Sequence, residues 1–162
     1  MPATISRIPP ATWSPTSDEM PLRIRRLRLS DYDELMRLFE ACGLDPRMRG
    51  RDSRSSIAHQ LRVNRGSYLG ALDGRRLVGA VLGTNDSRKG WINRLAVHPD
   101  YRRRGIAKRL VRAAERALRA KGIEMFAALI EPGNDASVRV FRSLGYEILP
   151  MVYARKKRNE GV

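Results

Sequence analysis

The chain has 162 residues, of which 42% are hydrophobic and 30% charged. This profile is typical of a globular domain with a buried core, and it excludes a disordered or fibrous chain. The formal net charge of +15 favours anionic partners, although charge informs on association and not on fold. No apolar run is long enough to cross a bilayer. The single cysteine excludes an internal disulfide or a cysteine-based metal cluster, and we expect no metal.

The first 21 residues are rich in proline and lack the apolar segment of a signal peptide. We therefore expect residues 1–21 to form a flexible leader, residues 22–157 to fold as one domain, and residues 158–162 to form a flexible tail. A cytoplasmic location is expected for the same reason.

The first half of the domain combines strands with two helices. Alternating apolar and basic residues over 21–27 predict a strand. Ser30 is suited to cap a helix that Gly43 ends, and Asp52 or Ser53 opens a second helix. Residues 66–85 are expected to form a hairpin around the turn at Asp73-Gly74.

The second half alternates strands and helices. A strand is expected over 90–97, a helix from Arg104 to Gly122, a buried strand over 124–131, and a helix from Asn134 to Gly145. Residues 146–156 indicate a closing hairpin with Pro150 at its turn. The order predicts a mixed α/β domain.

Residues 98–110, HPDYRRRGIAKRL, place three arginines and a glycine at the start of a predicted helix. The first turn of a helix leaves N–H groups without acceptors and carries a partial positive charge. Glycine there lets a bulky anion approach the backbone, so the segment is suited to bind phosphate. A solvated basic turn is the alternative, and this segment alone does not decide between them. The chain has neither a P-loop nor a dinucleotide-binding glycine pattern.

The stretch INRLAVHPDYRRRGIAKRLV resembles the central motif of the GNAT family of N-acetyltransferases. The family signature Arg/Gln-x-x-Gly-x-Gly/Ala is matched by Arg102, Gly105 and Ala107. The stretch IEPGNDASVRVFRSLGYE resembles the second motif, with Asn134, Ser137, Phe141, Gly145 and Tyr146 in the expected places. The resemblance covers about residues 22–157. It implies the α/β GNAT fold, with a mixed, mostly antiparallel sheet of six to seven strands flanked by helices.

The resemblance also implies that acetyl-CoA is the co-substrate. Its pyrophosphate would lie beside Arg102, on the backbone amides of Arg103, Arg104, Gly105, Ile106, Ala107 and Lys108. Its pantetheine arm would run along Leu95, Ala96 and Val97, with an amide near Leu95 polarising the acetyl carbonyl. Asn134 would contact the arm, Phe141 would lie near the thioester, and Ser137 belongs to the same cofactor-binding set.

Acetyl transfer to an amine requires loss of the amine's proton and a donor to the developing oxyanion. Many family members carry a glutamate where this chain has Asn93, and a tyrosine where it has Phe141. The proton must therefore leave through water or another carboxylate. Glu131 is the first candidate base, and the alternative is that it is an exposed charge at the end of a strand. Tyr153 is a candidate acid, and the alternative is that it packs at the edge of the sheet.

The expected function is an acetyl-CoA-dependent N-acetyltransferase acting by direct attack in a ternary complex. The acceptor would be a primary amine of a protein N-terminus, a lysine or a small molecule. A non-catalytic acyl-CoA-binding module and a nucleic-acid-associated basic module are the alternatives. The positive charge disfavours polycationic acceptors and favours acidic, ribosome-associated or nucleic-acid-associated ones. The loop 44–52 and the final hairpin are expected to shape the acceptor site, and the resemblance also allows a homodimer.

Overall fold

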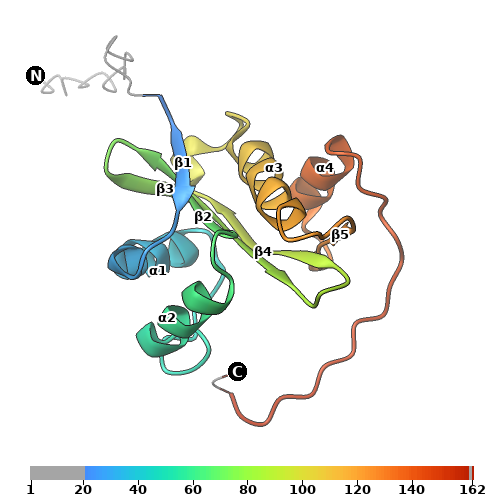
Figure 1. The fold of residues 1–162 in the computed structure, drawn as a ribbon, viewed down its shortest axis with the longest axis horizontal. Helices are drawn as coiled ribbons and strands as arrows, with labels where there is room; N and C mark the ends of the chain where they lie inside the picture. The colour runs from blue at the N-terminus through green and yellow to red at the C-terminus, as the bar shows by residue number, and fades with distance from the viewer. Residues whose placement is uncertain (1–20, 161) are drawn as a thin grey trace, which may run out of the picture.

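The computed structural model describes residues 21–160 and 162, and it places a five-stranded sheet between two pairs of helices (Figure 1). The strands follow one another across the sheet as β1 Arg23–Arg26, β2 Tyr68–Asp73, β3 Arg76–Asn85, β4 Gly90–Val97 and β5 Phe126–Ala127. The helices are α1 Tyr32–Ala41, α2 Arg54–Val63, α3 Ile106–Arg119 and α4 Asp135–Ser143. The mixed α/β class is confirmed. No helix within the described residues is both long and apolar enough to span a bilayer.

Each face of the sheet buries its own hydrophobic core, because the central strand β3 is apolar on both sides. Leu77 and Ala80 pack with α1, whereas Val78 and Val81 pack with α3. The two helix pairs accordingly cover opposite faces of the sheet (Figure 1). On the α3 side, Leu110 is completely buried among these residues. The near-continuous apolar run of β3 is the sequence pattern that such two-sided burial requires.

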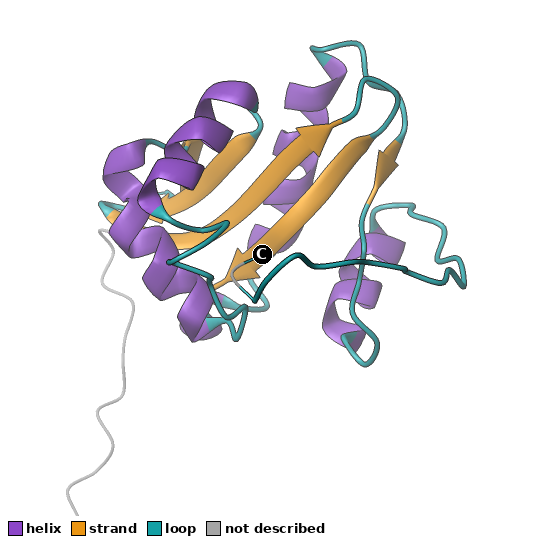
Figure 2. Ribbon diagram, turned by 90° about the horizontal axis from the view of Figure 1, so that it is seen from below, coloured by secondary structure: helices purple, strands orange, loops and turns teal. Residues whose placement is uncertain are grey.

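The sheet in the described residues has five strands, against the six to seven expected. The closing hairpin around Pro150 is not formed, and residues 146–157 run as a loop without strands (Figure 2). The expected strand over 124–131 is reduced to β5, which has two residues. A hairpin added beyond β5 needs a paired edge to extend, and so short an edge offers few backbone partners. Residues 1–20 of the expected leader and Gly161 lie outside the described residues.

Candidate active site

The parallel pair β4 and β5 separates after two residues. Gly90 pairs with Phe126 and Trp91 with Ala127, and the ladder ends there. From Ile92 onward β4 and the segment 128–131 line the two walls of a cavity. A parted parallel pair exposes backbone N–H and C=O groups of β4 that β5 no longer engages, and such groups are available to a ligand.

A bulge on the other edge of β4 adds to this exposure. Ala80 pairs with Ala96 and Leu82 with Asn93, so Val81 alone stands opposite two residues, Arg94 and Leu95. Arg94 has a φ of 49°, which is in the left-handed region that non-glycine residues rarely adopt. A bulge leaves its extra residue outside the ladder and turns the local backbone, and bulges are frequent beside active sites. The unusual backbone at Arg94 makes the middle of β4 a candidate functional position.

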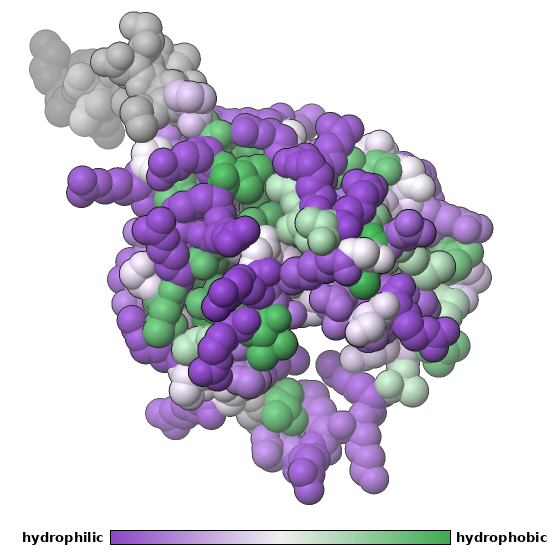
Figure 3. Space-filling view, viewed as in Figure 1, coloured by the Kyte–Doolittle hydropathy of each residue, from purple (hydrophilic) through white to green (hydrophobic). Residues whose placement is uncertain are grey.

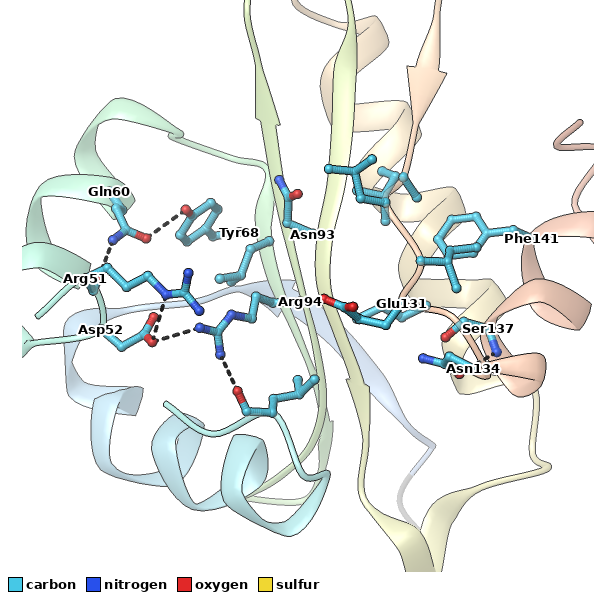
Figure 4. A pocket seen from close by; sticks show the side chains of 17 residues that line it. Arg51, Asp52, Gln60, Tyr68, Asn93, Arg94, Glu131, Asn134, Ser137 and Phe141 are labelled. Atoms are coloured by element: carbon cyan, nitrogen blue, oxygen red, sulfur yellow. Dashed lines mark hydrogen bonds and ion pairs between the residues drawn. The ribbon is translucent and has the colours of Figure 1, made fainter. Parts of the chain in front are cut away.

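The cavity between the strands has a volume of about 460 Å³ and reaches from α4 to the loop before α2 (Figure 4). Its lining consists of Leu44, Arg51, Asp52, Gln60, Tyr68, Leu82, Ile92, Asn93, Arg94, Leu95, Ala128, Leu129, Ile130, Glu131, Asn134, Ser137 and Phe141. This size and the mixture of apolar walls with a few polar groups suit a small ligand.

A buried ion pair joins the bulge to the loop before α2. An Arg94 Nη atom lies 2.8 Å from an Asp52 carboxylate oxygen, and the Asp52 side chain is only 5% exposed. The other Arg94 Nη donates to the Leu44 carbonyl at 3.2 Å, and the guanidinium carbon lies 5.1 Å from the centre of the Phe39 ring. The same carboxylate oxygen accepts from the Arg47 amide at 2.8 Å. The pair fixes the position of the loop against β4.

Tyr68 and Gln60 contribute polar side chains to the lining at the α2 end of the cavity (Figure 4). The Tyr68 hydroxyl donates to Gln60 Oε1 at 3.0 Å, and Gln60 Nε2 donates to the Arg51 carbonyl at 2.8 Å. Burial, with a smaller contribution from the negative charge of Asp52, raises the pKa of Tyr68 to about 12. Tyr68 is therefore a neutral hydrogen-bonding group at ordinary pH.

The arginine-rich loop lies at the end of β4. Arg102 Nε donates to the Val97 carbonyl at 3.2 Å, and the Tyr101 hydroxyl donates to Asp73 at 2.6 Å, which anchors the loop to the sheet. Arg103 and Gly105 have φ values of 63° and 73°, and α3 begins at the next residue. A Cβ built on Gly105 would meet no atom within 4 Å, so the outer side of this turn is open.

The cofactor residues expected from the resemblance fall into three groups. Leu95, Asn134, Ser137 and Phe141 line the cavity. Arg102, Arg103, Arg104, Gly105, Ile106, Ala107 and Lys108 form the anchored loop and the first turn of α3, where Ile106 is buried and the arginines and Lys108 are exposed. Ala96 and Val97 join the two groups along β4, with Ala96 buried in the core on the α1 side.

The two expected catalytic side chains lie in different surroundings. Glu131 is exposed and borders the cavity, and Figure 4 shows it across the cavity from Arg94. Tyr153 is 64% exposed on the loop after α4 and is not among the lining residues. Asn93 borders the cavity, but its amide nitrogen donates to Thr84 Oγ1 at 2.9 Å.

Sequence reasoning missed Arg94 and Tyr68. It placed Arg51 within a loop expected to shape the acceptor site, and it considered Asp52 only as part of that loop or as the start of the second helix, which Ser53 caps instead. No local pattern singles out Arg94, because its partner Asp52 is 42 positions away in the chain. The described residues contain no cluster of His, Cys, Asp and Glu side chains suited to hold a metal ion.

Comparisons with known proteins agree with this architecture. The acetyltransferase (GNAT) family model matches residues 32–146. Acetyltransferase SG1711 of Sodalis glossinidius is 32% identical over 142 residues, which cover 85% of this chain and 95% of that protein. Acetyltransferase ECA0875 of Pectobacterium atrosepticum is 30% identical over 141 residues, covering 84% and 95%. The crystal structure of PaiA N-acetyltransferase from Thermoplasma acidophilum in complex with coenzyme A has a TM-score of 0.74 at 19% identity, covering 82% of this chain and 94% of that one.

The fold and the site define a mixed α/β domain with a ligand-sized cavity between two separating parallel strands and an arginine- and glycine-rich turn at the start of α3. The chain belongs to the acetyltransferase (GNAT) family, as the family model and the relatives above show. It is accordingly an N-acetyltransferase.

Proposed function

We propose that the protein transfers the acetyl group of acetyl-CoA to a primary amine that enters the cavity from the α2 side. The single observation that carries this proposal is the separation of β4 from β5 after Trp91, with a cavity between them and the arginine loop at the end of β4. The solved relative from Thermoplasma acidophilum is described as a complex with coenzyme A, which supports the choice of co-substrate.

The arginine loop fits a pyrophosphate. The amides of Ile106, Ala107 and Lys108 belong to the first turn of α3, where N–H groups have no acceptor within the helix. The left-handed turn at Arg103 and the open side of Gly105 leave room for an anion against these amides. Arg102 and Lys108 are exposed and add positive charge around the same turn.

Residues along β4 then position the acetyl carbonyl. Bound acetyl-CoA supplies the activated acetyl group. The Leu95 amide, next to the bulge and on the cavity wall, is our candidate donor to the carbonyl oxygen as it gains negative charge. Asn134 and Ser137 line the α4 end of the cavity, where they would contact the pantetheine arm. Phe141, 3% exposed, gives that end an apolar wall and no proton donor.

Glu131 is our candidate to accept the amine proton, directly or through water. It is the carboxylate of the cavity lining that makes no ion pair within the described residues, whereas Asp52 is held by Arg94. Asn93 has no basic atom at neutral pH. Glu131→Gln should therefore lower kcat at pH 7 and recover part of it at alkaline pH, where the amine is already neutral. Equal pH profiles for the variant and the wild type would remove Glu131 from this role.

Calorimetric titration of acetyl-CoA tests the cofactor site. Gly105→Glu places a carboxylate on the open side of the loop, and we expect it to abolish the saturable binding seen with the wild type. Gly122→Glu is a matched control, since Gly122 also has a positive φ of 81° and open space around it, at the far end of α3. Loss of binding in both variants, or in neither, would contradict the assignment of the pyrophosphate to this loop.

A further inference from the structure

The α2 end of the cavity carries more positive than negative charge. Two guanidinium groups, Arg94 and Arg51, share the one carboxylate of Asp52, at 2.8 Å and 3.7 Å. Burial lowers the pKa of Arg94; the negative charge of Asp52 and, more weakly, that of Asp45 oppose this shift, and the positive charge of Arg51 adds to it. Within the cavity lining at this end, the two cations therefore share a single carboxylate, Asp52. A second anion at this end would relieve the repulsion between them.

Arg51 is the member of this cluster that is open to a ligand. Arg94 is 16% exposed and is engaged by Asp52, by the Leu44 carbonyl and by the Phe39 ring. The Arg51 side chain is 51% exposed, and its one ion pair within the described residues is made through Nε. Arg51 borders the cavity, so its two Nη atoms can make a bidentate contact with a carboxylate of a ligand.

A second, shallower hollow continues from the cavity along α2. Arg51 and Gln60 line both, and Ser55, Ser56 and His59 complete the second. Hydrophilic side chains also cover most of the face shown in Figure 3, including the region of α2. An acceptor longer than a small molecule would thus pass Arg51 and continue over polar side chains.

The residues near the acetyl position favour an amine that loses its proton easily. Asn93 has no atom that accepts a proton at neutral pH, and Glu131 is the one lining carboxylate without an ion pair in the described residues. At pH 7 roughly one in ten peptide α-amino groups is neutral, against roughly one in two thousand lysine side chains. The α-amine of a polypeptide N-terminus therefore demands far less of the base than a lysine side chain does.

We propose that Arg51 is the specificity-determining residue for acceptors in which a side-chain carboxylate lies close to an α-amino group. Such chemistry occurs in a polypeptide that begins with Asp or Glu and in a free acidic amino acid. This inference rests on the N-acetyl transfer proposed above. It excludes polyamines and other polycations as preferred acceptors.

The test uses acceptors that differ only in charge. Full-length protein is assayed for CoA release with peptides that begin Glu or Gln and are otherwise identical, with a Lys-first peptide, and with free glutamate and glutamine. The wild type should prefer the Glu-first peptide over its Gln-first partner by roughly tenfold or more in kcat/KM, the range of a charge-assisted contact. Higher activity on free glutamate than on the peptide would assign the carboxylate to a small-molecule acceptor, which also supports the role of Arg51.

Variants at two neighbouring arginines decide whether Arg51 is responsible. Arg51→Gln should bring the Glu-to-Gln preference close to one, while Arg51→Lys keeps part of it. Arg49→Gln is the matched control, since Arg49 is exposed on the same loop and borders neither hollow. Retention of the preference in Arg51→Gln, or equal loss of it in Arg49→Gln, would overturn the proposal.

A binding measurement separates this inference from the proposed reaction. In the presence of CoA, the acetylated Glu-first peptide should raise the melting temperature more than the acetylated Gln-first peptide, and Arg51→Gln should remove the difference. Turnover of many amines without a charge preference would overturn the role of Arg51 and leave the reaction intact. A charge preference in binding without turnover would retain Arg51 as the anion site and reject the reaction.

Discussion

Replacing Arg94 by methionine removes the cation of the buried ion pair and leaves the Asp52 charge where water hardly reaches it. The Asp52 side chain is 5% exposed, and Arg94 is its closest charged partner at 2.8 Å. What remains for the carboxylate is the Arg47 amide at 2.8 Å and Arg51 Nε at 3.7 Å. Methionine keeps most of the apolar volume beside Phe39, so the change isolates the charge.

Breaking one side of a buried ion pair costs about 3–5 kcal/mol, because the surviving charge stays desolvated. The two remaining contacts of Asp52 place this case near the lower end, at about 3 kcal/mol. For a domain of this size each kcal/mol lowers the melting temperature by roughly 2–4 °C, so we expect a drop of about 6–12 °C. Asp52→Asn added to Arg94→Met removes the stranded charge and should restore part of the stability.

Urea unfolding and thermal melts of the single and double variants measure these differences. Arg51→Met is the control: its pair with Asp52 is longer and half-exposed, so its loss should cost less than about 1 kcal/mol. A cost below about 1 kcal/mol for Arg94→Met, or a double variant less stable than Arg94→Met alone, would refute the reasoning. Either result would show that the pair does not hold the loop before α2 against β4.

Three further predictions follow from individual contacts. The difference in phenolate absorbance between wild type and Tyr68→Phe should show one titration near pH 12. Because the fold favours the neutral phenol, Tyr68 stabilises the fold below pH 10, and this contribution is lost as the pH rises. A titration midpoint near pH 10 would contradict the burial of the hydroxyl. The hydrogen bond from Arg25 lowers the pKa of Asp31 below 3.8, so the carboxylate stabilises the fold at neutral pH and this contribution is lost as pH falls through the lowered pKa. Asp31→Asn should be less stable than wild type at pH 7 and approach it at acid pH in urea melts, whereas a constant difference would argue against the linkage. Val152 is 97% exposed in an apolar loop, and we expect this loop to join two copies of the chain. Val152→Asp should then sediment as a monomer where the wild type sediments as a dimer, and a monomeric wild type would contradict the pairing.

Local patterns predicted most of the helices and strands correctly. The hairpin of β2 and β3 turns at Gly74, the strand β4 occupies Gly90–Val97 as expected, and α3 begins at Ile106, two residues after its expected start. These features depend on side-chain alternation and on turn residues, which are properties of neighbouring positions. The closing hairpin was not formed, since a strand pattern becomes a strand only where a long enough edge is available to pair with it.

For the candidate site too, some features follow from local sequence and others only from contacts between distant segments. By itself, the sequence determined the mixed α/β class through the order of its predicted elements, and it carried the family resemblance and the basic, glycine-containing pattern from Arg102 to Lys108 in short contiguous stretches. Only the tertiary structure decided where β4 parts from β5, that Arg94 adopts a left-handed backbone, and that its guanidinium meets Asp52. Those features depend on contacts between segments far apart in the chain and on burial, which determines whether a charge is solvated, paired or free to bind a ligand.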